Sequence, residues 1–194
     1  MELSPQLYHL LVRPPLWTKR YIHNVINRHF QLQNQIVMDF GSGVGSNCQL
    51  ADPDKYIGLE ICPKRVKFAS QIYPQYRFVH FNGGALPTPT EYVDCILIVA
   101  VLHHISSREV SEYIREFRRI LKPDGKILVM EPCLREQSRA SNWCMKNLDK
   151  GKYIRDEQGY LDMFHSHRFE TNVLRRFRKL VLYNELFFAA RPKY

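Results

Sequence analysis

The sequence predicts an α/β protein with a mostly parallel, doubly wound sheet and helices on both faces, and three observations lead to this class. Short apolar runs alternate with amphipathic stretches along the middle of the chain. Turns rich in glycine or proline separate them. The run Val93–Val99 is almost entirely apolar, as expected for a strand that is covered on both faces. Alternation of this kind is typical of parallel sheets.

The first elements are helices. Leu7–Val12 is expected to form a short helix that ends at Pro14 and Pro15. Leu16–Phe30 has apolar residues at helical spacing and is expected to form a longer one. The predicted strands that follow are Ile36–Phe40, Lys55–Glu60, Tyr76–Phe81, Val93–Val99 and Lys126–Glu131.

Two helices are predicted between these strands. One begins at Pro63 and carries Val66, Ala69 and Ile72 on one apolar face. The other begins after Ser106, which forms a capping box with Glu109.

Beyond Glu131 we expect two helices and then two strands. The helices are predicted at Leu134–Lys150 and Asp156–Phe164, and the strands at Arg168–Leu182 and Asn184–Arg191. The link between the strands is too short for a parallel crossover, so they should run antiparallel.

The length of 194 residues suits a single domain. Within it we expect an N-terminal helical lid (1–31), a ligand-binding core (36–131), an acceptor-covering segment (134–167) and a C-terminal strand pair (168–191). The five cysteines form no CxxC pair, and we find no cluster typical of a metal site. No signal peptide or membrane span is recognisable, which favours the cytoplasm.

The formal net charge of +9 favours anionic partners, nucleic acid among them, although no long basic run is present. The most basic stretch, Arg175 to Lys179, alternates with Phe177. This pattern favours an edge strand, where charges oppose strand-to-strand aggregation, over a nucleic-acid surface. The oligomeric state cannot be predicted.

Three glycines at every second position follow the first strand, in the stretch IVMDFGSGVGSN. Glycine permits positive φ and lets a ligand lie against bare backbone. The spacing departs from the dinucleotide fingerprint GxGxxG, because Ser46 stands where the third glycine would be. A nicotinamide dehydrogenase is therefore a disfavoured alternative.

Two carboxylates flank this turn and indicate the ligand. Asp39 precedes the first glycine by two residues, where it would repel a pyrophosphate and suit an ammonium group. Glu60 ends the next strand, where a carboxylate accepts hydrogen bonds from ribose hydroxyls. A ligand with a ribose and a cationic end fits both, and S-adenosylmethionine is such a ligand.

Five stretches resemble the class I S-adenosylmethionine-dependent methyltransferases in order and spacing, in particular the quinone-biosynthesis and natural-product subgroup. They are VMDFGSGVG, YIGLE, FNGGALP, YVDCILIVAVLHHI and LKPDGKILVMEP. The resemblance covers Ile36 to Pro132. It implies a Rossmann-like sheet of about seven strands with the last one antiparallel.

The resemblance also implies roles for residues. Asp39 would hold the amino group of the cofactor, Glu60 its ribose and Ile61 its adenine. Apart from the resemblance, we expect Tyr21 of the N-terminal segment to act as a lid residue near the cofactor carboxylate. The expected cofactor-binding set is Tyr21, Asp39, Gly41, Ser42, Gly43, Glu60, Ile61, Asn82, Gly83, Gly84, Val99, Ala100 and Leu102.

One segment departs from the family pattern. The family usually has Gly-Asp-Ala after the third strand, where the acid accepts from the adenine amino group. Here Asn82, Gly83 and Gly84 stand instead. The amide oxygen of Asn82 can still accept that bond.

Methyl transfer needs a base only if the acceptor must lose a proton. His103 and His104 directly follow the fourth predicted strand, at the floor of the acceptor site in this fold, and either could serve as a base or cap the junction. Glu131 ends the fifth strand and is a second candidate.

The sequence therefore predicts methyl transfer from S-adenosylmethionine to a small-molecule O, N or C acceptor. An RNA methyltransferase, which the positive charge favours, is one alternative. A regulator that binds the cofactor without catalysis is another.

Overall fold

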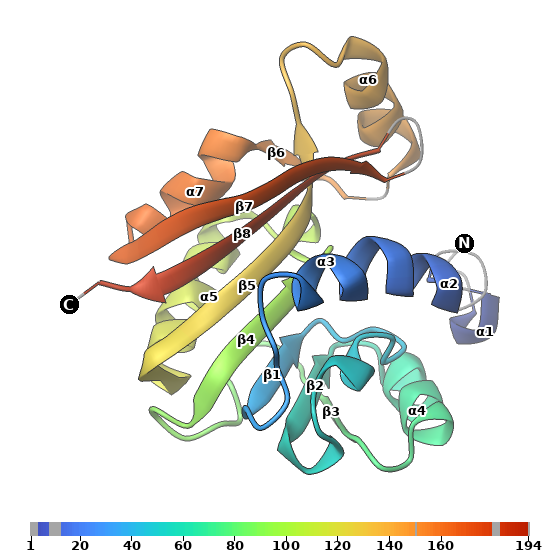
Figure 1. Cartoon of the computed structure of the whole chain (residues 1–194), viewed down its shortest axis with the longest axis vertical. Coiled ribbons are helices and arrows are strands. Elements are labelled where there is room, and N and C mark those ends of the chain that lie inside the picture. Colours follow the sequence, from blue (N-terminus) through green and yellow to red (C-terminus); the bar gives the residue numbers. More distant parts are fainter. Residues whose placement is uncertain (1–3, 8–12, 150, 180–182, 194) are drawn as a thin grey trace. The chain divides into compact units, whose positions relative to one another are not determined.

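The computed structural model describes residues 4–7, 13–149, 151–179 and 183–193. Figure 1 labels the helices and strands, and the chain divides into two compact units, residues 1–84 and 85–194. The predicted single domain therefore stays a prediction. Most of the short helix predicted at Leu7–Val12 lies outside the described residues.

The sheet of the first unit has three parallel strands in the order β3-β2-β1. They are β1 (Val37–Phe40), β2 (Tyr56–Glu60) and β3 (Arg77–His80), and β1 is buried along its whole length. Two short 3₁₀ turns, η3 (Cys48–Leu50) and η4 (Pro53–Lys55), lie between β1 and β2. All three strands lie within the segments predicted from the sequence.

Helix α4 (Pro63–Ile72) connects β2 to β3 and begins at the predicted proline. Its apolar face is narrower than predicted. Ala69 is fully buried, but Ile72 is 47% exposed. Ile72 is the last residue of the helix, where the chain turns away towards β3, so its side chain is not covered.

The predicted helix Leu16–Phe30 corresponds to three consecutive helical parts that begin at Pro15 and end at Asn27, and a short helix precedes them. The pieces are α1 (Pro5–Leu7), α2 (Pro15–Thr18), the π-helical turn η2 (Lys19–His23) and α3 (Asn24–Asn27). Ile22, Val25 and Ile26 are buried, as the helical spacing requires.

The sheet of the second unit has the strand order β4-β5-β8-β7. Strands β4 (Val93–Val99) and β5 (Leu121–Leu134) are parallel. Strand β8 (Tyr183–Pro192) runs antiparallel to both β5 and β7 (Phe169–Lys179). The predicted antiparallel strand pair is therefore confirmed.

Strand β5 is longer than predicted at both ends. Residues 121 and 126 both pair with β4, with a shift of register between them. At the other end, Cys133 and Leu134 pair with the short strand β6 (Arg155–Asp156). This pairing keeps the chain extended, so helix α6 (Arg139–Leu148) begins later than the predicted Leu134.

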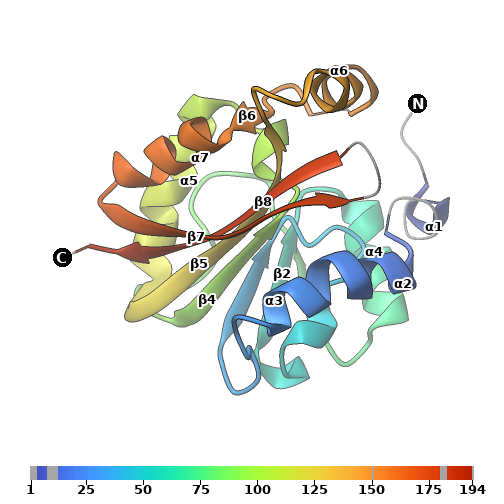
Figure 2. The ribbon, with the colours of Figure 1, turned by 45° about the horizontal axis from the view of Figure 1, so that its top comes forward.

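Two helices of this unit pack side by side. They are α5 (Ser107–Ile120) and α7 (Glu157–His165), and both views show them together (Figure 2). The predicted capping box is present, because Ser106 accepts from the backbone of Glu109 and Glu109 accepts from the backbone of Ser106. Asp156 caps α7 by accepting from the backbone N–H of Gly159.

Among the described residues, no helix combines the length and apolar character needed to cross a bilayer.

Candidate active site

The glycine turn after β1 has two structural roles. Gly41, Gly43 and Gly45 all have positive φ, of 75°, 58° and 80°. A Cβ added at Gly43 would meet nothing within 4 Å, so its backbone faces open space. A Cβ at Gly45 would lie 2.7 Å from the Phe78 ring. Gly43 is thus open to a ligand, whereas Gly45 allows close packing against Phe78 of β3.

Asp39 lies near the C-terminal end of β1 and is completely buried. Its Oδ2 accepts a hydrogen bond from the Tyr56 hydroxyl at 2.7 Å and a longer one from Asn47 at 3.5 Å. No partner for Oδ1 lies within hydrogen-bond distance among the described residues. A buried acceptor without a partner is costly, so Oδ1 is suited to a donor from a ligand.

Burial raises the pKa of Asp39 to about 6. The hydrogen bond from Tyr56 and the positive charge of Arg13 act in the opposite direction, and the negative charge of Glu60 adds to the rise. A cationic ligand group would offset the unfavourable burial of this carboxylate. Three more polar atoms in or next to the turn are buried and have no hydrogen-bond partner among the described residues. They are Ser42 Oγ, Ser46 Oγ and Asn47 Oδ1.

Glu60 holds the open glycine in place. Its Oε2 accepts from the backbone N–H of Gly43 at 2.9 Å, and its Oε1 accepts from that of Cys62, also at 2.9 Å. The Arg65 guanidinium lies 3.9 Å from Oε1. A carboxylate has about four acceptor sites, so Glu60 can still accept from ribose hydroxyls.

The other residues predicted in the first unit are more exposed. The Ile61 side chain is 69% exposed, and its contact with the adenine stays a prediction. Asn82, Gly83 and Gly84 are exposed, and a Cβ at Gly84 would meet nothing within 4 Å. Tyr21 lies in η2, half-buried, with the Arg20 guanidinium 5.6 Å from its ring centre.

The cofactor-binding residues predicted in the second unit lie at the end of β4 and directly after it. Val99 and Leu102 are buried, and Ala100 has a positive φ of 57°. The backbone N–H of Ala100 donates to Met130 on β5. Contact of Val99, Ala100 and Leu102 with the cofactor stays a prediction.

Glu131 organises the loop after β4. Its Oε1 accepts from the backbone N–H groups of Val101 and Leu102, at 2.7 and 2.8 Å. Its Oε2 accepts from the backbone N–H of His103 at 3.3 Å and from the ring Nδ1 of His103 at 2.7 Å. Both oxygens of this buried carboxylate are therefore occupied, and this geometry does not favour the predicted role of Glu131 as a base for the acceptor.

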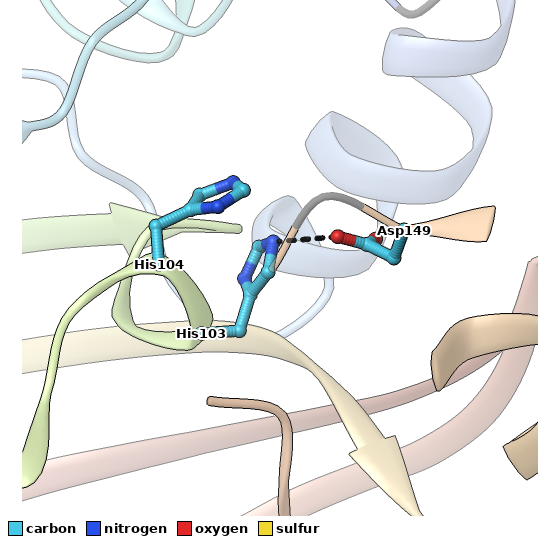
Figure 3. A group of neighbouring side chains, drawn as sticks. All are labelled: His103, His104 and Asp149. Carbon is cyan, nitrogen blue, oxygen red and sulfur yellow. Dashed lines mark ion pairs between the residues drawn. The ribbon is translucent and has the colours of Figure 1, made fainter. Parts of the chain in front are cut away.

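His103 lies between two carboxylates. Its Nδ1 faces Glu131, and its Nε2 lies 3.5 Å from Oδ1 of Asp149 (Figure 3). Burial alone would lower the pKa of His103, but its hydrogen bonds to Asp149 and Glu131 and the charges of these carboxylates raise it to about 10. The ring is then protonated at neutral pH, so this geometry does not favour the predicted general base.

The neighbouring His104 is exposed, and its ring centre lies 4.0 Å from that of His103. A base role for His104 stays a prediction.

The contact between residues 151–155 and the loop after β4 could not be predicted from the sequence. The backbone N–H of Tyr153 donates to the carbonyl of His103, and Arg155 donates to the carbonyls of Leu102 and Ile105. A Cβ at Gly151 would collide with the His103 ring. The segment around Gly151 to Arg155 is therefore fastened to the loop after β4. An aspartate and an arginine in an irregular stretch carry no signal of this contact.

Comparison with known proteins finds similarity to methyltransferases. The sequence model of the methyltransferase domain matches residues 38–129. An uncharacterised methyltransferase of Geobacillus kaustophilus is 32% identical over 108 residues, which cover 53% of this chain and 49% of that protein. The ubiquinone/menaquinone biosynthesis C-methyltransferase UbiE of Edwardsiella ictaluri is 28% identical over 110 residues, which cover 51% of this chain and 43% of that protein. The chain thus spans about half the length of the curated relatives it matches.

A solved structure is similar over nearly the whole chain. It is the magnesium protoporphyrin IX methyltransferase ChlM from Synechocystis with bound SAH (S-adenosylhomocysteine). The TM-score is 0.69 at 18% identity, with 94% of this chain and 88% of that chain covered. This likeness confirms the predicted Rossmann-like fold. The match to the methyltransferase domain and the similarity to the two methyltransferase relatives support a class I S-adenosylmethionine-dependent methyltransferase.

Proposed function

We propose that this protein transfers a methyl group from S-adenosylmethionine to a small-molecule acceptor with an O, N or C nucleophile. The observation that carries the proposal is the buried Asp39 carboxylate, whose Oδ1 has no partner among the described residues. It stands two residues before a glycine turn that is open at Gly43. An ammonium group satisfies this carboxylate, and a phosphate does not.

The candidate residues of the first unit then each have a role towards the cofactor. Asp39 accepts from the amino group, Glu60 accepts from the ribose hydroxyls, and Ile61 packs against the adenine. Asn82 accepts from the adenine amino group, and Tyr21 closes over the carboxylate end. The bound cofactor supplies a methyl group that is already activated by the sulfonium, so the protein contributes mainly position and orientation.

Two observations favour a small molecule over RNA as the acceptor. The cations of the basic strand β7 are engaged within the protein, because Arg176 pairs with Glu157, Arg178 donates to Asn184, and Arg175 lies over the Phe177 ring. In addition, the UbiE relative and ChlM are named for quinone biosynthesis and a porphyrin.

The test is a search for the methylated product. The purified protein is incubated with isotopically methyl-labelled S-adenosylmethionine and either a fractionated metabolite extract or total RNA. We expect a small molecule whose mass increases by one labelled methyl group. Label in RNA, with binding that weakens steeply as salt rises, would support the RNA alternative. Cofactor binding without transfer in either arm would point to a non-catalytic regulator.

Replacing Glu60 with alanine is expected to weaken cofactor binding. The substitution removes charge-assisted hydrogen bonds to the ribose and releases the N–H of Gly43, so the loss should be roughly 1–3 kcal/mol. Calorimetry with S-adenosylhomocysteine measures it. Glu112→Ala, which removes an exposed carboxylate on α5, is the control and should bind normally. Unchanged affinity in a folded Glu60→Ala protein would exclude Glu60 from the site.

A further inference from the structure

Three side chains of the second unit place metal-binding atoms close together. A ring nitrogen of His103, a ring nitrogen of His104 and a carboxylate oxygen of Asp149 all lie within 4.8 Å of one another (Figure 3). The distance from Nε2 of His103 to Oδ1 of Asp149 is 3.5 Å. Two ligands at zinc–nitrogen and zinc–oxygen distances in a tetrahedral site would be about 3.4 Å apart. The pair therefore already has the spacing that one ion requires.

Glu131 completes an arrangement that is common around metal-binding histidines. A histidine that binds a metal usually donates its second ring N–H to a carboxylate, which fixes the tautomer and the ring orientation. Nδ1 of His103 donates to Glu131 at 2.7 Å, and Nε2 points towards Asp149. Glu131 is itself held by backbone N–H groups.

The cluster is pre-organised but reachable from solvent. His103 is buried, the Asp149 side chain is 13% exposed, and His104 is exposed. Asp149 is further held by the backbone N–H of Gly151, which donates to Oδ1 at 2.6 Å. Two carboxylates face the His103 ring, so a divalent cation that replaces the proton on Nε2 would balance their charge.

We propose that His103, His104 and Asp149 bind one divalent transition-metal ion, with Glu131 orienting His103. Two imidazoles and one carboxylate suit zinc and its neighbours, whereas magnesium and calcium prefer oxygen ligands throughout. Three protein ligands with one exposed side leave a coordination position for water or another oxygen or nitrogen donor. No sequence motif marks this site, because Asp149 lies far from the two histidines along the chain.

Metal binding is tested with the ion alone, so the result does not depend on methyl transfer. The full chain is treated with a chelator and titrated with Zn²⁺ by calorimetry and with Co²⁺ by visible spectroscopy. We expect one ion per chain and the visible absorption of Co²⁺ in a nitrogen and oxygen site of low coordination number.

Substitutions separate this site from adventitious binding to other histidines and cysteines. His104→Ala and Asp149→Asn each remove a ligand without removing a fully buried side chain, and each should abolish the Co²⁺ spectrum. Glu131→Gln should weaken affinity by about 10–100-fold, as expected for a residue that orients a ligand. His29→Ala and Asp124→Asn change exposed residues elsewhere and should bind as the unmodified chain does. The proposal would be overturned if the unmodified chain bound no metal at micromolar concentration. It would also be overturned if His104→Ala and Asp149→Asn bound the metal as tightly as the unmodified chain.

Discussion

Glu131→Ala is expected to lower the free energy of unfolding by about 3–5 kcal/mol, the range for removing one partner of a buried ion pair. The carboxylate accepts from three backbone N–H groups and from the His103 ring, and all of these donors would lose their acceptor. Buried donors left without a partner are strongly unfavourable. Urea denaturation followed by circular dichroism measures the change.

The control for this experiment is Glu109→Ala. Glu109 is an exposed carboxylate in the capping box of α5, so its loss should lower the free energy of unfolding much less than the loss of the buried Glu131 does. If Glu131 served catalysis and not the architecture of the loop, Glu131→Ala would lose activity and keep its stability. A loss of stability no larger than that of Glu109→Ala would contradict the structural role assigned here.

Asp39→Asn is expected to weaken cofactor binding by about 1.5–3 kcal/mol, because the ammonium group loses a charged acceptor. The fold should not suffer. The amide introduced by this substitution would keep an oxygen to accept from Tyr56, and it would remove a buried charge whose ionisation is unfavourable. Calorimetry with S-adenosylhomocysteine and thermal denaturation separate the two effects. Asp124→Asn, which changes an exposed aspartate of β5, is the matched control.

The raised pKa of Asp39 also predicts a pH dependence. Its value of about 6 lies above the ordinary value of 3.8, so the folded chain holds a proton in this window that the unfolded chain has released. The contribution of Asp39 to stability is full below about pH 4 and is lost as the pH rises through 6. Cofactor affinity should change in the opposite direction and fall as the pH drops below 6, because protonated Asp39 carries no charge.

Both trends should disappear in Asp39→Asn. Affinity that stays constant between pH 5 and 8 in the unmodified chain would show that Asp39 does not bind the ammonium group.

The candidate cofactor residues could be proposed from the sequence because their signals are local. Asp39, Gly41 and Gly43 stand at every second position, and Glu60 ends the next strand. Parallel pairing of β1 with β2 then brings the ends of the two strands together. The capping box at Ser106 was equally predictable, since both partners lie within one turn of helix.

Tertiary contacts decided what no local pattern could show. Tyr56 supports Asp39 because its ring reaches across the β1–β2 pair, although Tyr56 looks like an ordinary strand residue in the sequence. Strand β5 extends to Leu134 because β6 offers it a partner, and this pairing shortens the predicted helix that follows.

The sequence by itself determined the fold class and indicated the candidate cofactor residues, because hydrophobic periodicity and the glycine turn act over a few residues. The tertiary structure decided the surroundings of His103 and Glu131. A histidine after a strand reads as a candidate base until its partners are known, and Asp149 comes from a segment with no pattern of its own. Protonation and coordination depend on which charges lie within a few ångströms, and folding alone sets those distances.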